Sequence, residues 1–176
     1  MKKVLSLIGI ALIASYLQGC ASGATVAGMT SVKTFGAAKN HMPAKIMVAP
    51  AEGGKSTNPL WTSQVGSKSF EEALTASLQS NGLLASGSGA YILKPTLQKL
   101  DQQLFGLDLT VKADVLYVLT DSASEKELFH EKINSSYTAT FNDAFVAIKR
   151  LRLANEGAIR ENIEALIERL ATVPLQ

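Results

Sequence analysis

The sequence predicts an α+β fold, a β-α-β-β-β-α two-layer sandwich in which a mainly antiparallel sheet packs against two helices. Apolar and polar residues alternate over Leu107–Leu119 and again over Phe129–Phe141. This period of two indicates two strands joined by a polar turn. From Ala144 the pattern becomes helical, with one apolar stripe from Ile148 to Leu170. A sheet with one apolar face, covered by helices, buries both kinds of stripe.

Three shorter elements precede the predicted hairpin. Lys45–Ala49 is an apolar run before Pro50 and is consistent with a first strand. Ser69–Glu72 has the pattern of a capping box, which would begin a helix that Asn81-Gly82 ends. Tyr91–Leu100 is expected to be the second strand.

Two residues inside the predicted elements are unfavourable for them. Pro95 cannot donate a backbone hydrogen bond, so it indicates an edge or a bulge in the second strand. Gly157 lies within the long C-terminal helix, where glycine costs about 1 kcal/mol relative to alanine. We therefore expect a break or a close packing contact at Gly157.

The first 19 residues have the pattern of a secretory signal peptide. Lys2 and Lys3 precede the apolar run Val4–Ala14, which is shorter than the roughly 18–20 residues of a membrane-spanning helix. The following residues, Leu17-Gln18-Gly19-Cys20, resemble the lipobox of bacterial lipoproteins, although Gln18 stands where that motif usually has a small residue. Cys20 is the only cysteine, so the chain can form no internal disulfide. The alternative is an ordinary secreted protein with one thiol.

The resemblance to the lipobox implies how the chain is processed. Leu17, Gln18 and Gly19 would be recognised by the signal peptidase, and cleavage would leave Cys20 as the first residue. Cys20 would carry a diacylglycerol on its sulfur and an acyl chain on its amino group, enough for stable anchoring without further membrane contacts. Because no aspartate follows Cys20, resemblance to enterobacterial sorting implies the outer membrane, with the domain facing the periplasm. No other cofactor is expected.

Composition divides the chain into three parts. Residues 1–19 are the expected signal peptide, and their removal leaves 157 of the 176 residues. Residues 20–44 are rich in Gly, Ala, Ser and Thr and are expected to form a tether with an end-to-end distance of roughly 25–30 Å. A short edge strand at Val32–Phe35 is the alternative there. Residues 45–176 are expected to form a single domain.

The charge of the mature chain argues against several partners. The precursor has 17 basic and 15 acidic residues, and removal of Lys2 and Lys3 leaves 15 of each. A neutral chain gives no reason to expect nucleic acid or a polybasic membrane contact. Gly54-Lys55-Ser56 matches the end of a phosphate-binding loop, but Ala49 stands where the first glycine is needed and Asn58-Pro59 interrupts the following helix. No nucleotide is therefore expected.

The sequence contains no recognisable catalytic or metal-binding motif. The two histidines are His41, in the expected tether, and His130, on the polar face of a predicted strand, and no zinc-ligand spacing is present. The sequence Glu71-Glu72 fits helix capping better than acid–base catalysis. A periplasmic hydrolase that uses His130 is one alternative, although no serine lies in a Gly-x-Ser-x-Gly turn. A domain that binds a small apolar ligand between sheet and helices is another.

Two regions are candidate partner surfaces. Leu116 and Val118 point to the face of their strand opposite the apolar stripe. They are either covered by a loop or the tether, or form an exposed apolar patch that meets a partner. The only tryptophan, Trp61, lies in the expected loop Ala51–Gln64 and could belong to such a surface or to the core.

The chain also resembles, in architecture and spacing, YajG-like and related small outer-membrane lipoproteins. Beyond the lipobox, the resemblance rests on Phe70-Glu71-Glu72-Ala73-Leu74, Asn81-Gly82-Leu83, the strand Leu109–Leu119 and the closing run Glu156–Ile163. It implies a non-enzymatic binding or accessory component of a cell-envelope complex, in assembly or transport, with a protein partner. The family offers no catalytic residues to carry over, and a shared fold alone does not fix a function.

Overall fold

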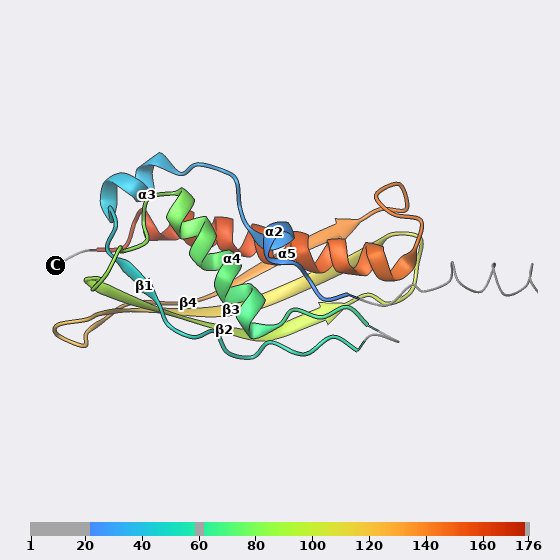
Figure 1. Cartoon of the computed structure of the whole chain (residues 1–176), viewed down its shortest axis with the longest axis horizontal. Helices are drawn as coiled ribbons and strands as arrows, with labels where there is room; N and C mark the ends of the chain where they lie inside the picture. The colour runs from blue at the N-terminus through green and yellow to red at the C-terminus, as the bar shows by residue number, and fades with distance from the viewer. Residues whose placement is uncertain (1–21, 59–61, 175–176) are drawn as a thin grey trace, which may run out of the picture.

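The computed structural model describes residues 22–58 and 62–174. Its sheet has the strand order β1-β2-β3-β4, formed by β1 (Ile46–Val48), β2 (Tyr91–Gln102), β3 (Leu109–Asp121) and β4 (Glu127–Ala139). The helices are α2 (Val26–Met29), α3 (Gly36–His41), α4 (Ser67–Ser80) and α5 (Ala147–Leu170). They lie on one side of the sheet, and α5 runs along its length (Figure 1). The predicted α+β class is confirmed, and the predicted order β-α-β-β-β-α is found from β1 to α5, whereas the two short helices α2 and α3 that precede it were not predicted.

The sheet is antiparallel except at β1. β2, β3 and β4 pair as an antiparallel meander, whereas β1 pairs in parallel with Tyr91–Leu93 of β2. In β3 every second residue from Leu109 to Leu119 is buried, as its alternation predicts. Pro95 belongs to β2 and lies two residues after Leu93, the last residue of β2 that pairs with β1. The N–H that proline lacks therefore interrupts no pairing between β1 and β2. A bulge follows Pro95, between Leu97 and Lys99.

The strands β3 and β4 are shorter than the alternation suggests. Leu107 precedes β3 and Phe141 follows β4, and both are exposed. Their residues continue the apolar–polar pattern after the hydrogen-bonded ladder has ended. Both residues therefore belong to loops at one end of the sheet and not to the core.

The predicted capping box at Ser69–Glu72 is wrong. α4 begins two residues earlier, at Ser67, and its N-cap Gly66 makes no side-chain capping bond. The Ser67 hydroxyl instead accepts a hydrogen bond from the Gly54 amide, and the Glu71 carboxylate accepts one from the Ala51 amide, both at 3.0 Å. These side chains hold the loop after β1 against α4. The other end is as predicted, since Gly82 adopts a left-handed backbone with φ +66°.

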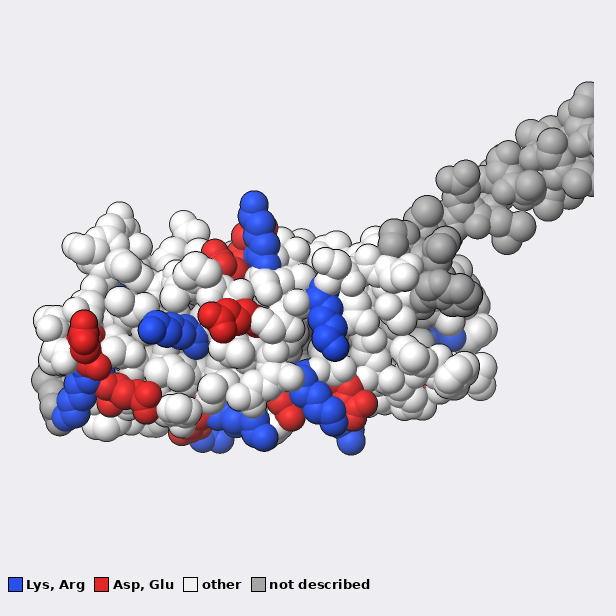
Figure 2. Space-filling view, turned by 90° about the horizontal axis from the view of Figure 1, so that it is seen from below, with Lys and Arg blue, Asp and Glu red and all other residues white. Residues whose placement is uncertain are grey.

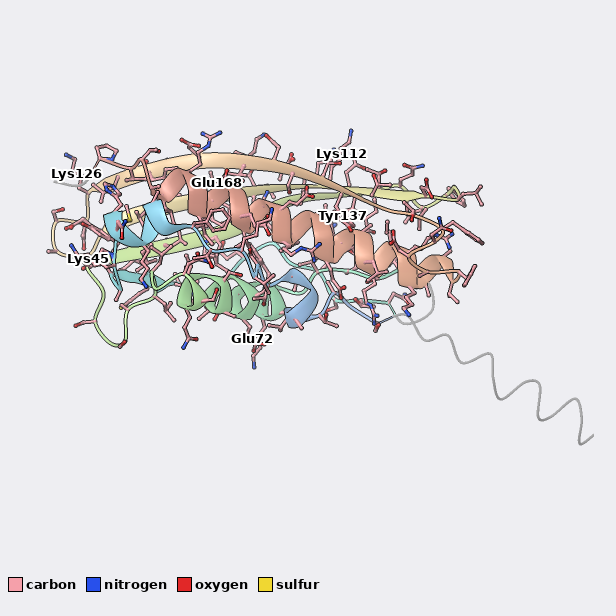
Figure 3. The ribbon with its side chains drawn as sticks, turned by 90° about the horizontal axis from the view of Figure 1, so that it is seen from above. Lys45, Glu72, Lys112, Lys126, Tyr137 and Glu168 are labelled. Atoms are coloured by element: carbon pink, nitrogen blue, oxygen red, sulfur yellow. The ribbon has the colours of Figure 1, made fainter. Side chains whose placement is uncertain are left out.

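Gly157 makes a close packing contact without breaking α5. The ring of Tyr137, on β4, lies against the helix so closely that a Cβ at residue 157 would be 2.2 Å from its Cγ. Tyr137 is labelled in Figure 3 beside the middle of α5. The Arg160 guanidinium stands over the same ring, 5.6 Å from its centroid. Glycine therefore allows the helix to approach the sheet here.

The expected tether at residues 20–44 is wrong for the part that the structure describes. Residues 22–44 contain α2 and α3, and Met29, Ala38 and Met42 are fully buried in the core. The alternative edge strand at Val32–Phe35 does not form either, because residues 31–35 are neither helix nor strand. The folded domain therefore begins by Ser22 and not at Lys45.

Buried polar groups hold this N-terminal segment to the two long helices. Ser31 donates its amide to the Ser77 hydroxyl and its own hydroxyl to Glu164. Lys33 forms an ion pair with Glu164, and this hydrogen bond raises the pKa of Lys33. The side-chain amide of Asn81 accepts a hydrogen bond from the backbone N–H of Phe35 and donates one to the Lys33 carbonyl. These hydrogen bonds add to the burial of Met29, Ala38 and Met42 in fixing the segment on the domain.

Candidate functional site

The face of the sheet opposite the helices is open. The helix-covered face buries alternate residues of β3, and the residues between them point to the other side. Leu116 and Val118 are among these, and both are partly exposed. The strands lie below the helices in Figure 1, and Figure 2 views this side, where basic and acidic side chains are interspersed among uncharged ones. The sequence therefore predicted the side of Leu116 and Val118, and none of the helices in residues 22–58 and 62–174 lies over them.

The strand register defines the surroundings of this apolar pair. Leu116 lies between Thr96 on β2 and Lys132 on β4. Val118 lies between Lys94 on β2 and His130 on β4. We call Leu116, Val118 and these four cross-strand neighbours the open-face patch. It has a small apolar centre with a polar rim, the general anatomy of a protein-binding surface.

Lysines stand around the open-face patch together with two carboxylates. Among the described residues, Lys94, Lys112 and Lys132 form no ion pair, whereas Lys99 pairs with Asp101 at 3.2 Å. Lys112, labelled in Figure 3, is on the same face further along β3 and projects away from the helices. Asp114, on the same face between Lys112 and Leu116, and Asp101, opposite Lys112, make the charge of this face mixed. The lysines without an ion pair, beside partly exposed apolar side chains, offer contacts to carboxylates of a partner.

His130 lies on this face without a nucleophile. Its Nδ1 is 3.0 Å from Glu127, and both side chains are about half exposed (53% and 52%). Among the described residues no serine or threonine hydroxyl hydrogen bonds to His130. Two of the three groups of a Ser–His–acid triad, the imidazole and the carboxylate, are therefore paired at the surface, but the described residues place no hydroxyl nucleophile within hydrogen-bond distance of the imidazole.

Several predicted site residues lie outside the described residues. These are the signal-peptide residues, the lipidation residue and the loop tryptophan: Leu17, Gln18, Gly19, Cys20 and Trp61. The other sequence candidates have structural roles. His41 ends α3 and its Nε2 contacts the Val173 carbonyl. Glu72, labelled in Figure 3, is exposed and lies 4.0 Å from Lys68. The Gly54 amide binds the Ser67 hydroxyl and is not part of a phosphate cradle.

Three cavities of the domain bear on the ligand-binding alternatives. One of about 280 Å³ is lined by Lys55, Gln64 and the bulge of β2, and one of about 390 Å³ by residues including Asp101, Thr110 and Lys112. A third, of about 230 Å³, lies where β4 meets the end of α5 and is lined by residues including His130, Glu131 and Arg169. Charged side chains line all three, and none of them is the apolar cavity between sheet and helices that a small apolar ligand would need.

Two further findings concern the described part of the chain. In residues 22–58 and 62–174, no three His, Cys, Asp or Glu side chains are grouped so that they could hold a metal ion. Over the same ranges, no helix combines the length and the apolar character needed to cross a membrane.

Comparison with known proteins gives similarity of fold only. No family model matches the sequence, and no curated protein matches it either. A solved structure of a candidate lipoprotein from Caulobacter crescentus is similar with a TM-score of 0.55 and 18% identity, over 78% of this chain and 94% of that one. A Xanthomonas campestris protein gives 0.54 and 12%, over 72% and 84%. A minor lipoprotein from Acinetobacter baumannii gives 0.51 and 13%, over 76% and 96%. The chain therefore shares its fold with bacterial proteins that include lipoproteins.

Proposed function

We propose that this chain is a lipid-anchored, periplasm-facing lipoprotein of the outer membrane that acts as a non-enzymatic binding component of a cell-envelope complex. The lipobox resemblance at Leu17-Gln18-Gly19-Cys20 supports the anchor, and the fold shared with bacterial lipoproteins is consistent with it. The open-face patch is the single observation that carries the binding role, because it leaves two apolar side chains, Leu116 and Val118, partly exposed on the face of the sheet opposite the described helices.

The chemistry of the described residues favours binding over catalysis. Buried polar side chains of the core hold elements together: Asn162, for example, accepts from the Tyr117 hydroxyl and donates to the Ile133 carbonyl. The polar groups of the open-face patch lie on a sheet surface, and the half-exposed His130 also borders the cavity of about 230 Å³ beside Arg169. Such a surface can recognise a partner but gives little stabilisation to a developing charge.

The open-face patch also indicates the chemistry of the partner. A complementary surface would place apolar side chains opposite Leu116 and Val118 and carboxylates opposite Lys94, Lys112 and Lys132. A stable interface needs about 800 Å² from each protein, so the contact would extend along β2, β3 and β4. We propose an envelope protein with an acidic rim around an apolar centre.

Site-specific crosslinking in living bacteria tests the partner surface. A photoreactive amino acid in place of Leu116, in the otherwise unchanged precursor, should give one discrete adduct. The same amino acid in place of Glu161, which is exposed on the helical side, serves as the control and should not give it. The charge-reversing pair Lys94→Glu and Lys132→Glu should abolish the Leu116 adduct. Equal adducts from both positions, or an adduct that survives charge reversal, would contradict this surface.

A second experiment tests the anchor separately. Cys20→Ala should leave uncut precursor or release soluble protein, because the residue that carries the lipid is gone. Density fractionation of the wild-type envelope should place the protein with outer-membrane markers. Unchanged processing and fractionation of the Cys20→Ala variant would exclude lipidation at Cys20.

A further inference from the structure

Exposed large apolar side chains gather at one end of the domain. Among the described residues seven are substantially exposed, and six of them belong to two loops: Leu104, Phe105, Leu107, Phe141, Phe145 and Val146. Phe105 is 87% exposed and Phe145 is 79% exposed. We call these six residues the apolar tip. Scattered exposed apolar residues are ordinary on protein surfaces, but a cluster of this kind marks a contact with another apolar phase.

The two loops of the apolar tip are joined into one surface. The first connects β2 to β3 and the second connects β4 to α5, so both lie at the end where α5 begins (Figure 1). The Asp108 carboxylate in the first loop accepts a hydrogen bond of 2.9 Å from the Phe141 amide in the second. The rings of Phe141 and Phe145 meet edge to face, with 5.2 Å between their centroids.

A buried arginine supports the second loop from beneath. Arg150 is 4% exposed and donates to the carbonyls of Ala144 and Phe145, at 2.6 and 2.9 Å. Its guanidinium also stands 5.3 Å from the centroid of the Phe141 ring. Arg150 therefore holds the backbone of this loop in place, while the side chains of Phe145 and Val146 stay exposed at the surface.

The described part of the chain begins, with Ser22, at this same end. The Ser22 hydroxyl accepts a hydrogen bond of 2.7 Å from Arg152, which is six residues after Val146 and therefore about 9 Å along the helix axis. Two residues of chain span at most about 7 Å, so Cys20 must lie close to Ser22. Because the domain begins by Ser22, no long tether separates the residue that would carry lipid from the apolar tip.

We propose that the apolar tip inserts into the interfacial layer of the same bilayer that holds the acyl chains of Cys20. This inference rests on the proposed lipidation of Cys20. Apolar side chains beside a lipid anchor can enter the headgroup and acyl boundary to a depth of about 5–10 Å. The anchor makes the bilayer the occupant of this surface, because it holds the membrane against this end of the domain at all times.

Two carboxylates and one lysine border the apolar tip. The Asp108 carboxylate accepts from the Phe141 amide, and Asp143 accepts from the amide and hydroxyl of Thr140. Lys149 is exposed on the first turn of α5, where its ammonium group can meet lipid phosphates. Insertion of the tip would also make the long direction of α5 point away from the membrane.

Depth measurement on the lipidated chain tests the proposal. Lipid on Cys20 consumes the only thiol, so Phe105→Cys and Phe145→Cys each supply a unique site for an environment-sensitive fluorophore. Val32→Cys is the matched control, because Val32 is the seventh exposed apolar residue (90%) and lies next to Lys33, the partner of Glu164. Glu164 is about 27 Å along α5 from Val146. The purified proteins are reconstituted in phosphatidylethanolamine–phosphatidylglycerol vesicles with or without lipids that are spin-labelled near the headgroup.

The quenching pattern decides the question. Spin-labelled lipid should reduce the fluorescence at residues 105 and 145 by about twofold or more, the behaviour of interfacially buried groups, and leave residue 32 unchanged. Absence of quenching at 105 and 145, or equal quenching at 32, overturns the insertion. Flotation of the wild-type chain with vesicles reports the anchor independently. If wild-type Cys20 reacts with the dye and the chain does not float, lipidation itself fails, and the insertion proposal fails with it.

Discussion

Glu156, on α5, accepts two hydrogen bonds from a single residue, Thr25, which precedes it by 131 positions. The Thr25 amide and hydroxyl both donate to the same carboxylate oxygen, each at 2.8 Å. The Glu156 side chain also packs against Gly28, in the helix α2 that follows Thr25, so closely that a Cβ at residue 28 would be 2.3 Å from its Cδ. This contact fixes the first residues of the domain to its last helix.

Removing the carboxylate should loosen the N-terminal segment. Glu156→Ala removes the acceptor of the Thr25 amide and hydroxyl, and because Thr25 is exposed and water can reach these donors, the loss is that of ordinary hydrogen bonds, about 0.5–1.5 kcal/mol each. Urea unfolding should show this loss, and limited proteolysis should cut residues 22–42 faster. Glu161→Ala, on an exposed position of the same helix, should change neither measurement appreciably. Equal effects of the two variants would contradict the role of Glu156.

Gly157→Ala should destabilise the protein although alanine favours helices. The added Cβ would meet the Tyr137 ring at 2.2 Å, and overpacking of this kind costs about 1–3 kcal/mol. Gly87→Ala is the matched control, since a Cβ there meets nothing within 4 Å. Thermal unfolding of both variants makes the comparison. A higher melting temperature for Gly157→Ala would show that the ring moves aside at little cost.

Tyr117 should make the protein sensitive to alkali. Burial raises the pKa of its phenol far above the usual value of 10.0. The folded state therefore keeps this proton when the unfolded state loses it, and the contribution is complete below pH 10 and is lost as the pH rises further. Tyr117→Phe should remove this alkaline slope from urea unfolding measured at several pH values. Tyr91→Phe leaves Tyr117 in place and should retain the slope.

The same Tyr117→Phe change should lower stability at neutral pH. The Tyr117 hydroxyl donates to Asn162 at 2.9 Å in the core, and the unpaired amide oxygen should cost about 1–3 kcal/mol. Equilibrium unfolding at pH 7 measures it. A neutral effect would indicate that water replaces the hydroxyl.

The loop that carries Phe141 and Phe145 should weaken in acid. Hydrogen bonds from the amide and hydroxyl of Thr140 lower the pKa of Asp143 below its usual 3.8. Since the folded pKa is the lower one, the contribution of Asp143 is present above the unfolded value and is lost as the pH falls through the folded one. The stability difference between the wild type and Asp143→Asn should therefore shrink below about pH 4. A difference that stays constant down to pH 2 would contradict this.

Long periodic elements could be predicted from the sequence. In β3 successive residues face the core and the open side in turn. The apolar–polar alternation therefore predicts both the strand and the face on which each of its residues lies. The stripe of α5 is equally clear because the helix is long enough to repeat its period several times. The side on which Leu116 and Val118 lie follows from the same rule.

The N-terminal segment could not be predicted in this way. α2 has four residues and α3 has six, too few to show a helical period. Their order depends on partners far along the chain, such as Glu156 and Asn81, which no local pattern reveals. The small residues of this segment are typical of a linker in the sequence. In the structure they allow the segment to approach α5, as Gly28 does beside Glu156.

The apolar tip could not be predicted, because the apolar–polar alternation of β3 and β4 continues in the sequence beyond the ends of both strands. Leu107 and Phe141 keep the alternation of their strands, but the hydrogen-bonded pairing of Leu109 with Ala139 is the last before both loops. A sequence shows which side chains are apolar, whereas the position where pairing stops depends on the other strand. Places where local pattern and final structure disagree are often functional, and the tip is such a place.

The contact between Thr25 and Glu156 also bears on the order in which the chain can fold. A loop of 131 residues must close before the pair can meet, and long-range contacts of this kind form late. α2 packs on α4 and α5, so its docking is incomplete until the last element has been synthesised. The proposed cleavage before Cys20 has a consequence here, since a peptidase that acts during translocation would cut before residues 22–42 have docked on α5. Under that proposal, processing and lipidation would precede completion of the domain.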